Sequence, residues 1–260
     1  MSIEAVAKIK QTIEEADGIV VLTGAGMSVE SGIPDFRGAS GYWTASKDNF
    51  MKFSNGTAFH ERPLEAWNFY ISRIINYGKL EPHRGYYDLK NLLAGLTKDV
   101  FVVTSNVDGY FKKSGYDHEK IYEIHGNLEF IQCKDRCCDK LWPMPIFTDL
   151  LTHDDQMPAC SECGSILRPA VMMFNDPWFV MKIVEEQSQR CMAWYSDKKN
   201  VVGIEIGAGL AVPSIRLHSY ERTQTAIRIN PHDYQVSRPQ DISLQASAID
   251  GIDILVKIIG

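Results

Sequence analysis

The sequence predicts an α/β fold, a Rossmann-like, doubly wound parallel sheet with two smaller modules attached to it. First, short runs rich in β-branched residues alternate with longer stretches of helical periodicity, as in a sheet whose parallel strands are joined by helices. Second, glycines and polar residues follow these runs, at the edge where the strands of such a sheet would end. Third, the composition shifts once, towards Cys, Pro and Asp, over residues 129–176.

Six runs have the length and composition of buried parallel strands, at residues 18–22, 100–104, 121–124, 201–206, 225–229 and 242–244. Helical periodicity recurs between most of them, at 64–77, 83–96 and 179–196. Residues 1–17 also place apolar side chains at helical spacing, with charged residues between them. We therefore expect an amphipathic helix at the N-terminus and not a signal peptide.

The chain, residues 1–260, has the length of one large domain or of a main domain with an insertion. Residues 36–96 are too long for one crossover helix between the first two strands, so they should form a helical side module. The cysteine-bearing stretch 129–176 has little periodicity and should be a second inserted module. The large sheet would then be built from three segments, 1–35, 97–128 and 177–260.

Composition and charge exclude several classes of protein. The chain is 45% hydrophobic and 23% charged, which is typical of a folded globular protein and not of a disordered one. The formal net charge is −6 and no Lys/Arg run forms a basic stripe, so we expect no nucleic-acid partner. No apolar stretch approaches the roughly 18 residues that a membrane span needs. We therefore expect a cytoplasmic protein without membrane contact.

Glycine or polar clusters follow five of the predicted strands. They are Gly24-Ala25-Gly26, the segment 105–108, His125-Gly126, Gly207-Ala208-Gly209, and Asn230. The carboxyl ends of parallel strands share one edge of the sheet, and ligands bind in the crevice outside that edge. A Gly-Ala-Gly segment at a helix start would let backbone N–H groups approach a pyrophosphate. The pattern therefore predicts a nucleotide site.

Five of the six cysteines lie close together in the chain, which predicts a metal site instead of a disulfide framework. Cys160 and Cys163 form a C-x2-C pair. Cys133 pairs with Cys137 or Cys138, and the sequence leaves both open, although the shorter spacing favours Cys137. Four thiolates can close a tetrahedral structural zinc site with no open position for water. We therefore predict one Zn²⁺, with Cys133, Cys137, Cys160 and Cys163 as its ligands.

Residues 24–38 read GAGMSVESGIPDFRG, which closely resembles the signature GAGxSxxSGIPDFRG of the sirtuin family. The resemblance continues over nearly the whole chain, because TSNVD at 104–108 is similar to the family's TQNID and EIHG at 123–126 matches its (H/E)xHG. Ile229 and Asn230 match its ribose-binding pair IN. The resemblance implies an NAD-dependent protein-lysine deacylase that acts on acylated proteins and releases nicotinamide and O-acyl-ADP-ribose.

The resemblance also implies roles for individual residues. His125 would be the general base that takes a proton from the nicotinamide ribose, whose hydroxyl then attacks the imidate formed from the acyl oxygen and C1′. Asn106 would position water and ribose, and Asp108 would hold the loop and the nicotinamide pocket. Arg37 would order its segment over the cofactor, and Phe36 would shield the reactive face from water.

The contacts to NAD would come mainly from the loops at the strand ends. The implied cofactor-binding residues are Gly24, Ala25, Gly26, Ser28, Asp35, Phe36, Arg37, Ser105, Asn106, Asp108, Gly207, Ala208, Gly209, Asn230 and Ala246. The acylated peptide would bind as an added strand between 172–175 and 209–213, so Met172 and Phe174 are predicted substrate contacts.

Tyr70 and Arg73 lie three residues apart in a predicted helix and hence on one face of it. A phenol and a guanidinium together can hold a carboxylate by a forked, charge-assisted hydrogen bond. The sirtuin subgroup that removes malonyl, succinyl and glutaryl groups carries Y-x-x-R at this place. The resemblance therefore allows an acidic acyl group as well as acetyl.

The sequence departs from the family pattern at four places. Ser105 replaces Gln of TQNID, Met172-Met173 and Asn175-Asp176 replace Val-Trp and Gly-Glu of RPxVVWFGE, and Ala208-Gly209 replaces Thr-Ser. These changes leave the substrate class open. Alternatives are a protein ADP-ribosyltransferase or NAD hydrolase on the same scaffold, and a non-enzymatic NAD or ADP-ribose sensor. The presence of His125, Asn106 and Asp108 argues against the sensor.

Overall fold

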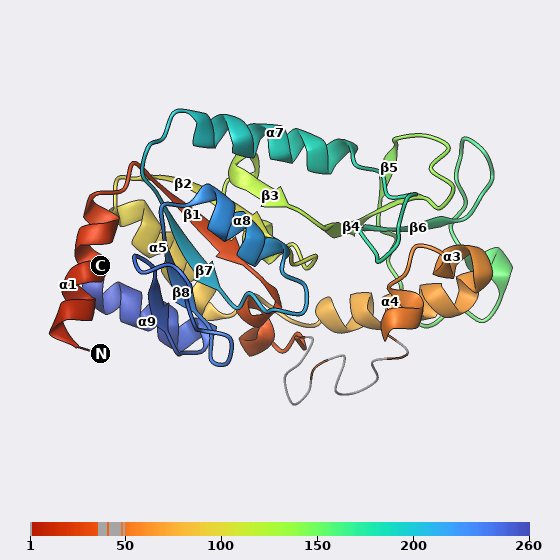
Figure 1. Cartoon of the computed structure of the whole chain (residues 1–260). Helices are drawn as coiled ribbons and strands as arrows, with labels where there is room; N and C mark the ends of the chain where they lie inside the picture. The colour runs from red at the N-terminus through yellow and green to blue at the C-terminus, as the bar shows by residue number, and fades with distance from the viewer. Residues whose placement is uncertain (1, 36–40, 42–47, 49) are drawn as a thin grey trace.

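The computed structural model describes residues 2–35, 41, 48 and 50–260, which form two sheets towards opposite ends of an elongated molecule (Figure 1). The larger sheet has six parallel strands in the order β3-β2-β1-β7-β8-β9. Their bounds are β1 Gly18–Thr23, β2 Asp99–Thr104, β3 Ile121–Glu123, β7 Val201–Ile206, β8 Thr225–Ile229 and β9 Ile242–Leu244. The six predicted strands are therefore confirmed, each to within one residue at either end.

The strand order reverses at the centre of this sheet, where β1 and β7 pair side by side. Every residue of these two strands is buried, because helices cover both faces of the sheet. A reversal of strand order opens a crevice between the loops that leave the two strands, and ligands bind in that crevice.

Helices cover both faces of this sheet, and each face has its own hydrophobic core. They are α1 (Ile3–Glu14), α5 (Arg84–Gly95) and α9 (Ala248–Ile259) on one face, and α7 (Lys182–Ser196) and α8 (Ser214–Arg222) on the other. Strand β1 contributes to both cores by alternation: Ile19 and Val21 pack with the first group, and Val20 and Leu22 with the second. The helices predicted at 1–17, 83–96 and 179–196 are confirmed as α1, α5 and α7.

The smaller sheet is antiparallel, in the order β5-β4-β6, and the sequence did not predict it. Its strands are β4 Gly126–Cys133, β5 Leu141–Pro143 and β6 Leu167–Val171. The pairing of β4 with β6 shifts register between Gly126 and Ile131, and both strands bury polar side chains, Gln132 and Arg168. These features remove the alternation of apolar and polar residues by which a strand is recognised.

Helices α3 (Ala58–Glu61) and α4 (Pro63–Tyr77) pack against the smaller sheet and share one hydrophobic core with it. Trp67 of α4 is fully buried there and donates from its indole N–H to the carbonyl of Leu167 in β6 over 2.9 Å. The helix predicted at 64–77 is thus α4. The remaining short elements are α6 Tyr110–Lys113 and the 3₁₀ turns Ala25–Met27, Val29–Ser31, His118–Lys120 and Asp154–Gln156.

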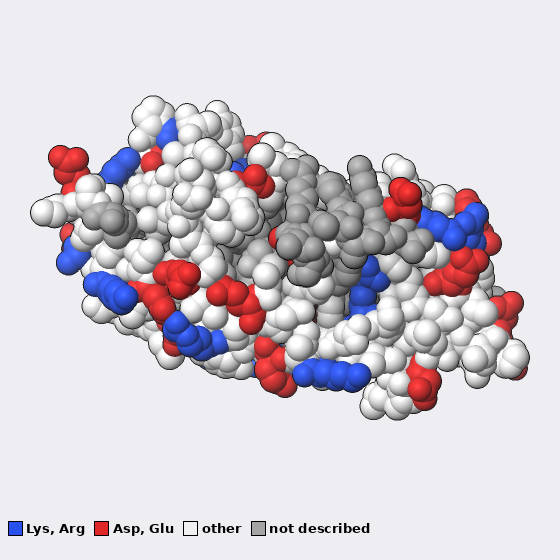
Figure 2. All heavy atoms as spheres, turned by 90° about the horizontal axis from the view of Figure 1, so that it is seen from below, with Lys and Arg blue, Asp and Glu red and all other residues white. Residues whose placement is uncertain are grey.

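The surface carries charges of both signs. On the face shown in Figure 2, the coloured Lys, Arg, Asp and Glu side chains are interspersed, and those drawn in colour form no extended basic area. Within the described part of the chain, no helix is both long enough and apolar enough to span a membrane.

Candidate functional site

Two cavities meet at the carboxyl edge of the large sheet. The first has a volume of about 670 Å³ and lies among the loops that follow β1, β2, β7 and β8; it is termed the switch-point cavity below. The second, about 330 Å³, lies between these loops, α4 and the loop after β6, and is termed the module cavity. Both cavities have the same five residues in their walls, namely Ala25, Ser105, Asn106, His125 and Val212.

The Gly24-Ala-Gly26 loop lines the switch-point cavity, but for a different physical reason from the expected one. The N–H of Gly24 donates to the carbonyl at the end of β7, and the N–H of Gly26 donates to Gly207 over 3.0 Å. A Cβ on Gly24 would lie 2.8 Å from backbone atoms of Gly207 and Ala208, and a Cβ on Gly26 would lie 2.6 Å from the Cα of Gly207. A 3₁₀ turn, and not an α-helix, follows. The glycines therefore permit close backbone packing, and their own two N–H groups are bonded to Ile206 and Gly207 within the protein.

Asn106 and Asp108 are held by one shared hydroxyl, that of Ser28. Ser28 Oγ donates to Asp108 Oδ2 over 2.7 Å, accepts from Asn106 Nδ2 over 3.0 Å, and lies 2.8 Å from the Tyr86 hydroxyl. Because Ser28 has a single proton, Tyr86 must be the donor in its own contact. Burial raises the pKa of Asp108, and hydrogen bonds from Ser28 and the N–H of Tyr110 oppose that shift. The network fixes the two predicted side chains in the wall of the module cavity.

His125 follows β3 and stands in the wall between the two cavities. Its carbonyl accepts from the N–H of Met172 over 2.8 Å, which ties β3 to the loop after β6. Burial lowers the pKa of the imidazole, while a hydrogen bond to the backbone of Ser105 acts in the opposite direction. Nε2 lies 3.3 Å from the hydroxyl of Ser214, the first residue of α8. Ser214 could not be predicted from the sequence, because this contact depends on how α8 packs.

The structure brings most of the predicted cofactor residues together. The switch-point cavity is lined by Gly24, Ala25, Gly26, Asp35, Ser105, Asn106, Gly207, Ala208, Gly209 and Asn230. Ala246 instead packs against the core beneath α5 and α9, and its neighbours Ser247 and Ala248 line the cavity. Phe36 and Arg37 lie outside the described residues.

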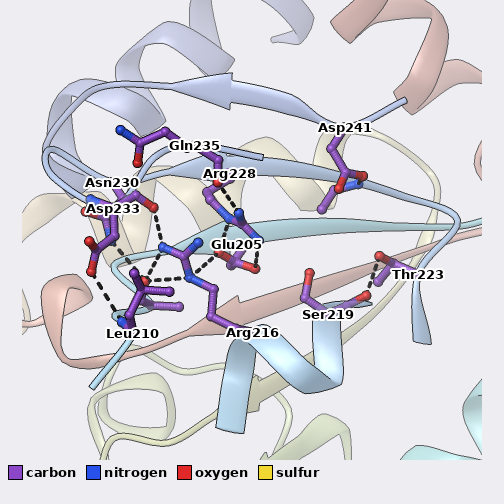
Figure 3. Close-up of polar contacts among 12 residues, drawn as sticks. Glu205, Leu210, Arg216, Ser219, Thr223, Arg228, Asn230, Asp233, Gln235 and Asp241 are labelled. Atoms are coloured by element: carbon purple, nitrogen blue, oxygen red, sulfur yellow. Dashed lines mark hydrogen bonds and ion pairs between the residues drawn. The ribbon is translucent and has the colours of Figure 1, made fainter. Parts of the chain in front are cut away.

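A buried ionic cluster holds the Ala208 loop in the wall of this cavity, and the sequence did not predict it (Figure 3). Glu205 of β7, 1% exposed, pairs with Arg228 over 2.5 Å and with Arg216 over 3.4 Å. Arg216 also donates to the carbonyl of Ala208 from Nε and an Nη atom, over 3.0 and 2.8 Å, and Asn230 donates to that same carbonyl over 3.0 Å. These contacts fix the Ala208-Gly209 loop through its backbone.

The module cavity is apolar along most of its wall, with a polar end formed on α4. Tyr70 and Arg73 line it together with Met172 and Phe174, as the sequence predicted for substrate contacts. Tyr70 is buried, and burial raises the pKa of its phenol while a hydrogen bond with Ser54 opposes the shift. The guanidinium of Arg73 stacks 3.4 Å from the centre of the Phe69 ring and donates to the Phe69 carbonyl over 2.9 Å. Tyr70 and Arg73 therefore place a phenol and a guanidinium in the wall of the same cavity.

Four cysteine sulfurs converge beside the smaller sheet. The ligand atoms of Cys133, Cys137, Cys160 and Cys163 all lie within 4.8 Å of one another. The Sγ–Sγ distances are 3.7 Å for Cys133–Cys163 and 3.6 Å for Cys137–Cys160. A tetrahedron with Zn–S bonds of about 2.3 Å has sulfurs about 3.8 Å apart, so the four thiols fit Zn²⁺. The cluster includes Cys137 and not Cys138, which packs against the hydrophobic core.

Comparison with known proteins identifies the family. The Sir2 family model matches residues 24–212. The NAD-dependent protein deacylase of Aeropyrum pernix is 31% identical over 259 residues, covering 99% of this chain and 98% of the relative. The chain belongs to the Sir2 family. NAD-dependent protein deacylase 1 of Archaeoglobus fulgidus is 28% identical over 255 residues, or 96% of each chain.

Solved Sir2 structures share this fold. A Sir2 homologue–NAD complex matches with a TM-score of 0.72 at 27% identity, covering 97% of this chain and 93% of the other. A mutant Sir2 homologue in complex with ADP-ribose matches with a TM-score of 0.75 at 27% identity, covering 100% and 96%. Fold class and family, as predicted from the sequence, are therefore confirmed.

The structure gives a physical reason for two departures from the Sir2 pattern. Asn175 adopts a left-handed backbone conformation, with φ of 49°, which asparagine tolerates better than most residues, so it can stand where the pattern has glycine. Asp176 is 1% exposed and forms a bidentate pair with Arg168, 0% exposed, with both distances 2.8 Å. Asp176 thus anchors the loop that carries Met172 and Phe174 from inside the protein.

We expect Asp176→Ala to lower the free energy of unfolding by about 3–5 kcal/mol, because it leaves the Arg168 guanidinium buried without its carboxylate. Denaturant titration measures the change. As a matched control, Glu81→Ala removes the exposed partner of Lys113 and should cost about 0–1 kcal/mol. The double variant Arg168→Met/Asp176→Leu should regain most of the loss. A loss under about 1 kcal/mol for Asp176→Ala would contradict the anchoring role.

Proposed function

We propose that this chain is an NAD-dependent protein-lysine deacylase, which moves the acyl group from lysine to ADP-ribose and releases nicotinamide. The observation that carries the proposal is the position of His125 in the wall common to the two cavities. One cavity lies at the switch point, where α/β sheets bind nucleotides, and the other is a largely apolar pocket suited to an acylated side chain. The Sir2 relatives named NAD-dependent protein deacylases support it.

The two cavities dictate how the substrates would lie. The switch-point cavity would hold NAD, with its nicotinamide ribose at the end where Asn106 and His125 stand, because these residues belong to the wall that the two cavities share. The adenosine would then lie at the opposite end, near Asn230 and Ser247. The acyl-lysine side chain would enter the module cavity between α4 and the loop after β6.

Bound NAD supplies an electrophilic ribose carbon with nicotinamide as its leaving group, and a hydroxyl that accepts the acyl group. His125 takes the proton from that hydroxyl through Nε2, and its lowered pKa keeps the ring unprotonated and able to do so at neutral pH. Asn106, fixed by Ser28, orients the ribose and a water molecule. The apolar wall of the module cavity excludes bulk water from the reacting atoms.

We assign NAD binding to the part built from 1–35, 97–128 and 177–260, and the zinc site to the module 129–176. Helices α3 and α4 of the segment 36–96 would close the acyl-lysine cavity. The partners would be acylated proteins, with no nucleic acid or membrane involved. We place the enzyme in the cytoplasm, where four clustered thiols remain reduced.

The test is to incubate the protein with NAD and acylated lysine peptides and to analyse the products by mass spectrometry. A deacylase yields peptide with an unmodified lysine, nicotinamide and O-acyl-ADP-ribose in equal amounts. Peptide or protein carrying ADP-ribose, or free ADP-ribose alone, would show the transferase or NAD hydrolase instead. Binding of NAD without release of nicotinamide would show a sensor.

The choice of acyl group is predicted to depend on Tyr70 and Arg73. A charge-assisted pair with a distal carboxylate contributes about 1.5–3 kcal/mol, or roughly ten- to a hundredfold. We therefore expect succinyl- or malonyl-lysine peptide to have a higher kcat/KM than acetyl-lysine peptide. Arg73→Met should flatten or reverse this order while leaving NAD affinity unchanged.

Lys52→Met is the matched control for this experiment, because Lys52 is an exposed cation paired with Glu65 on the surface. It removes a charge near α4 and should leave the ranking of acyl groups as it is. A wild-type preference for acetyl peptide, or an Arg73→Met variant with an unchanged ranking, would refute acidic-acyl recognition without affecting the deacylase assignment.

A further inference from the structure

Ser214 contacts the proposed base directly, from an element that the sequence did not connect with it. Its hydroxyl lies 3.3 Å from His125 Nε2, and both residues line the module cavity. The imidazole also hydrogen-bonds to the backbone of Ser105. A neutral imidazole has one N–H, so donation to Ser105 leaves Nε2 as the acceptor that faces Ser214.

The backbone at Ser214 is held firmly. Ser214 is the first residue of α8, and the next residue, Ile215, is 1% exposed in the core between α8 and the sheet. Arg216, one residue further, is bound to Glu205 and to the carbonyl of Ala208 (Figure 3). The hydroxyl is therefore presented to His125 from a fixed position.

We infer that Ser214 is a positioning residue for His125, which orients the neutral ring and stabilises it once it has taken a proton. In the free enzyme the Ser214 hydroxyl donates to Nε2 and restricts rotation of the ring about its Cβ–Cγ bond. Because Nε2 has a single lone pair, this hydroxyl turns aside when the ribose hydroxyl approaches Nε2. Once the ribose oxygen has given up its proton and bonded to the acyl carbon, Nε2–H donates to Ser214 Oγ, and hydrogen bonds to a charged group are about twice as strong as those between neutral groups. This stabilisation acts against the burial that disfavours the cation.

The inference rests on the proposed function, because it requires His125 to be the base. Ser214→Ala should reduce kcat for deacylation by roughly 3- to 10-fold, as expected for one hydrogen bond. KM for NAD and for peptide should stay within about twofold, since Ser214 would act in the proton-transfer step and not in binding. Ser214→Thr, which retains the hydroxyl, should restore kcat to within about twofold of wild type.

Ser219→Ala is the matched control, because Ser219 is a buried serine on the same helix, and its Oγ has no hydrogen-bond partner among the described residues. It should leave kcat unchanged. In the background of His125→Ala, Ser214→Ala should have no further effect, because residues that act as a unit are non-additive.

The possible results distinguish a failure of the Ser214 inference from a failure of the proposed function. If His125→Ala abolishes deacylation but Ser214→Ala has wild-type kcat, the role of Ser214 is refuted and the proposed function stands. An equal rise of KM in Ser214→Ala and Ser214→Thr would also refute it, because the effect would then be steric. If His125→Ala itself retains wild-type activity, the base assignment fails and the inference fails with it.

Discussion

His125→Ala is expected to reduce turnover of an acyl-lysine peptide by about 10²-fold or more, the usual effect of losing a general base. NAD affinity should remain within a few-fold of wild type, because the switch-point cavity would contact the nucleotide along many other residues. Steady-state kinetics with saturating NAD, together with calorimetric titration of NAD, would measure the two quantities separately.

His232→Ala provides the matched control. His232 lines the switch-point cavity as well, but it is absent from the shared wall and belongs to the loop after β8. Its removal deletes an imidazole of the same size at the proposed adenosine end and should change kcat by no more than a few-fold. A His125→Ala variant with near wild-type turnover would remove His125 from the mechanism.

The pH dependence of kcat/KM offers a second measurement on the same residue. A general base must be unprotonated, so the rate falls as the pH drops through its pKa. Because burial lowers the pKa of His125 below 6.5, full activity should persist to a lower pH than an ordinary histidine would allow. Glu123, whose pKa burial raises to about 7, lies two residues away, so the profile should be repeated with Glu123→Gln. An acid limb centred above pH 6.5 in that variant would contradict the assignment.

The large sheet could be predicted from the sequence because its strands are simple. In β1 and β7 every residue is buried, so each strand appears in the sequence as a short, mostly apolar run between turns. Such a run can be recognised without any alternation of apolar and polar residues. The smaller sheet could not be predicted, because Arg168 and Gln132 are buried polar residues whose partners, Asp176 and the backbone carbonyl of Trp178, lie outside the two strands. Such partners are known only once the chain is folded.

The candidate site also contains some residues that could be predicted from the sequence and others that could not. Asn106, Asp108 and His125 were predictable because each follows a strand, and topology alone brings the ends of parallel strands together. Tyr86, Ser214 and the Glu205 cluster were missed because they reach the site from helices or from the middle of a strand. Gly24 and Gly26 line the switch-point cavity, but the sequence could not show that their lack of a Cβ makes room for the backbone of Gly207.

Removal of zinc is expected to unfold the cysteine-bearing module, residues 129–176, and not merely to reduce activity. The four cysteines connect the end of β4 and the loop after it to the loop that precedes β6, and two of them, Cys133 and Cys160, are buried in the core shared with α3 and α4. Structural zinc sites contribute about 10–16 kcal/mol of apparent binding free energy in small zinc-binding peptides, so a module of this size should not stay folded without the metal. Purified protein should contain about one zinc per chain, and chelation should shift the emission of the buried Trp67 to the red.

The cysteine pair that the sequence left open provides the control for this experiment. Cys137→Ser should lose zinc, because Cys137 Sγ lies 3.6 Å from Cys160 Sγ within the cluster. Cys138→Ser changes the adjacent cysteine, which lies outside the cluster and packs on the core, and should keep about one zinc per chain. Zinc content by atomic emission and thermal unfolding with and without chelator would distinguish the variants. Less than a tenth of an equivalent of zinc in wild-type protein prepared without chelator, or equal zinc loss in both variants, would contradict the proposed ligand set.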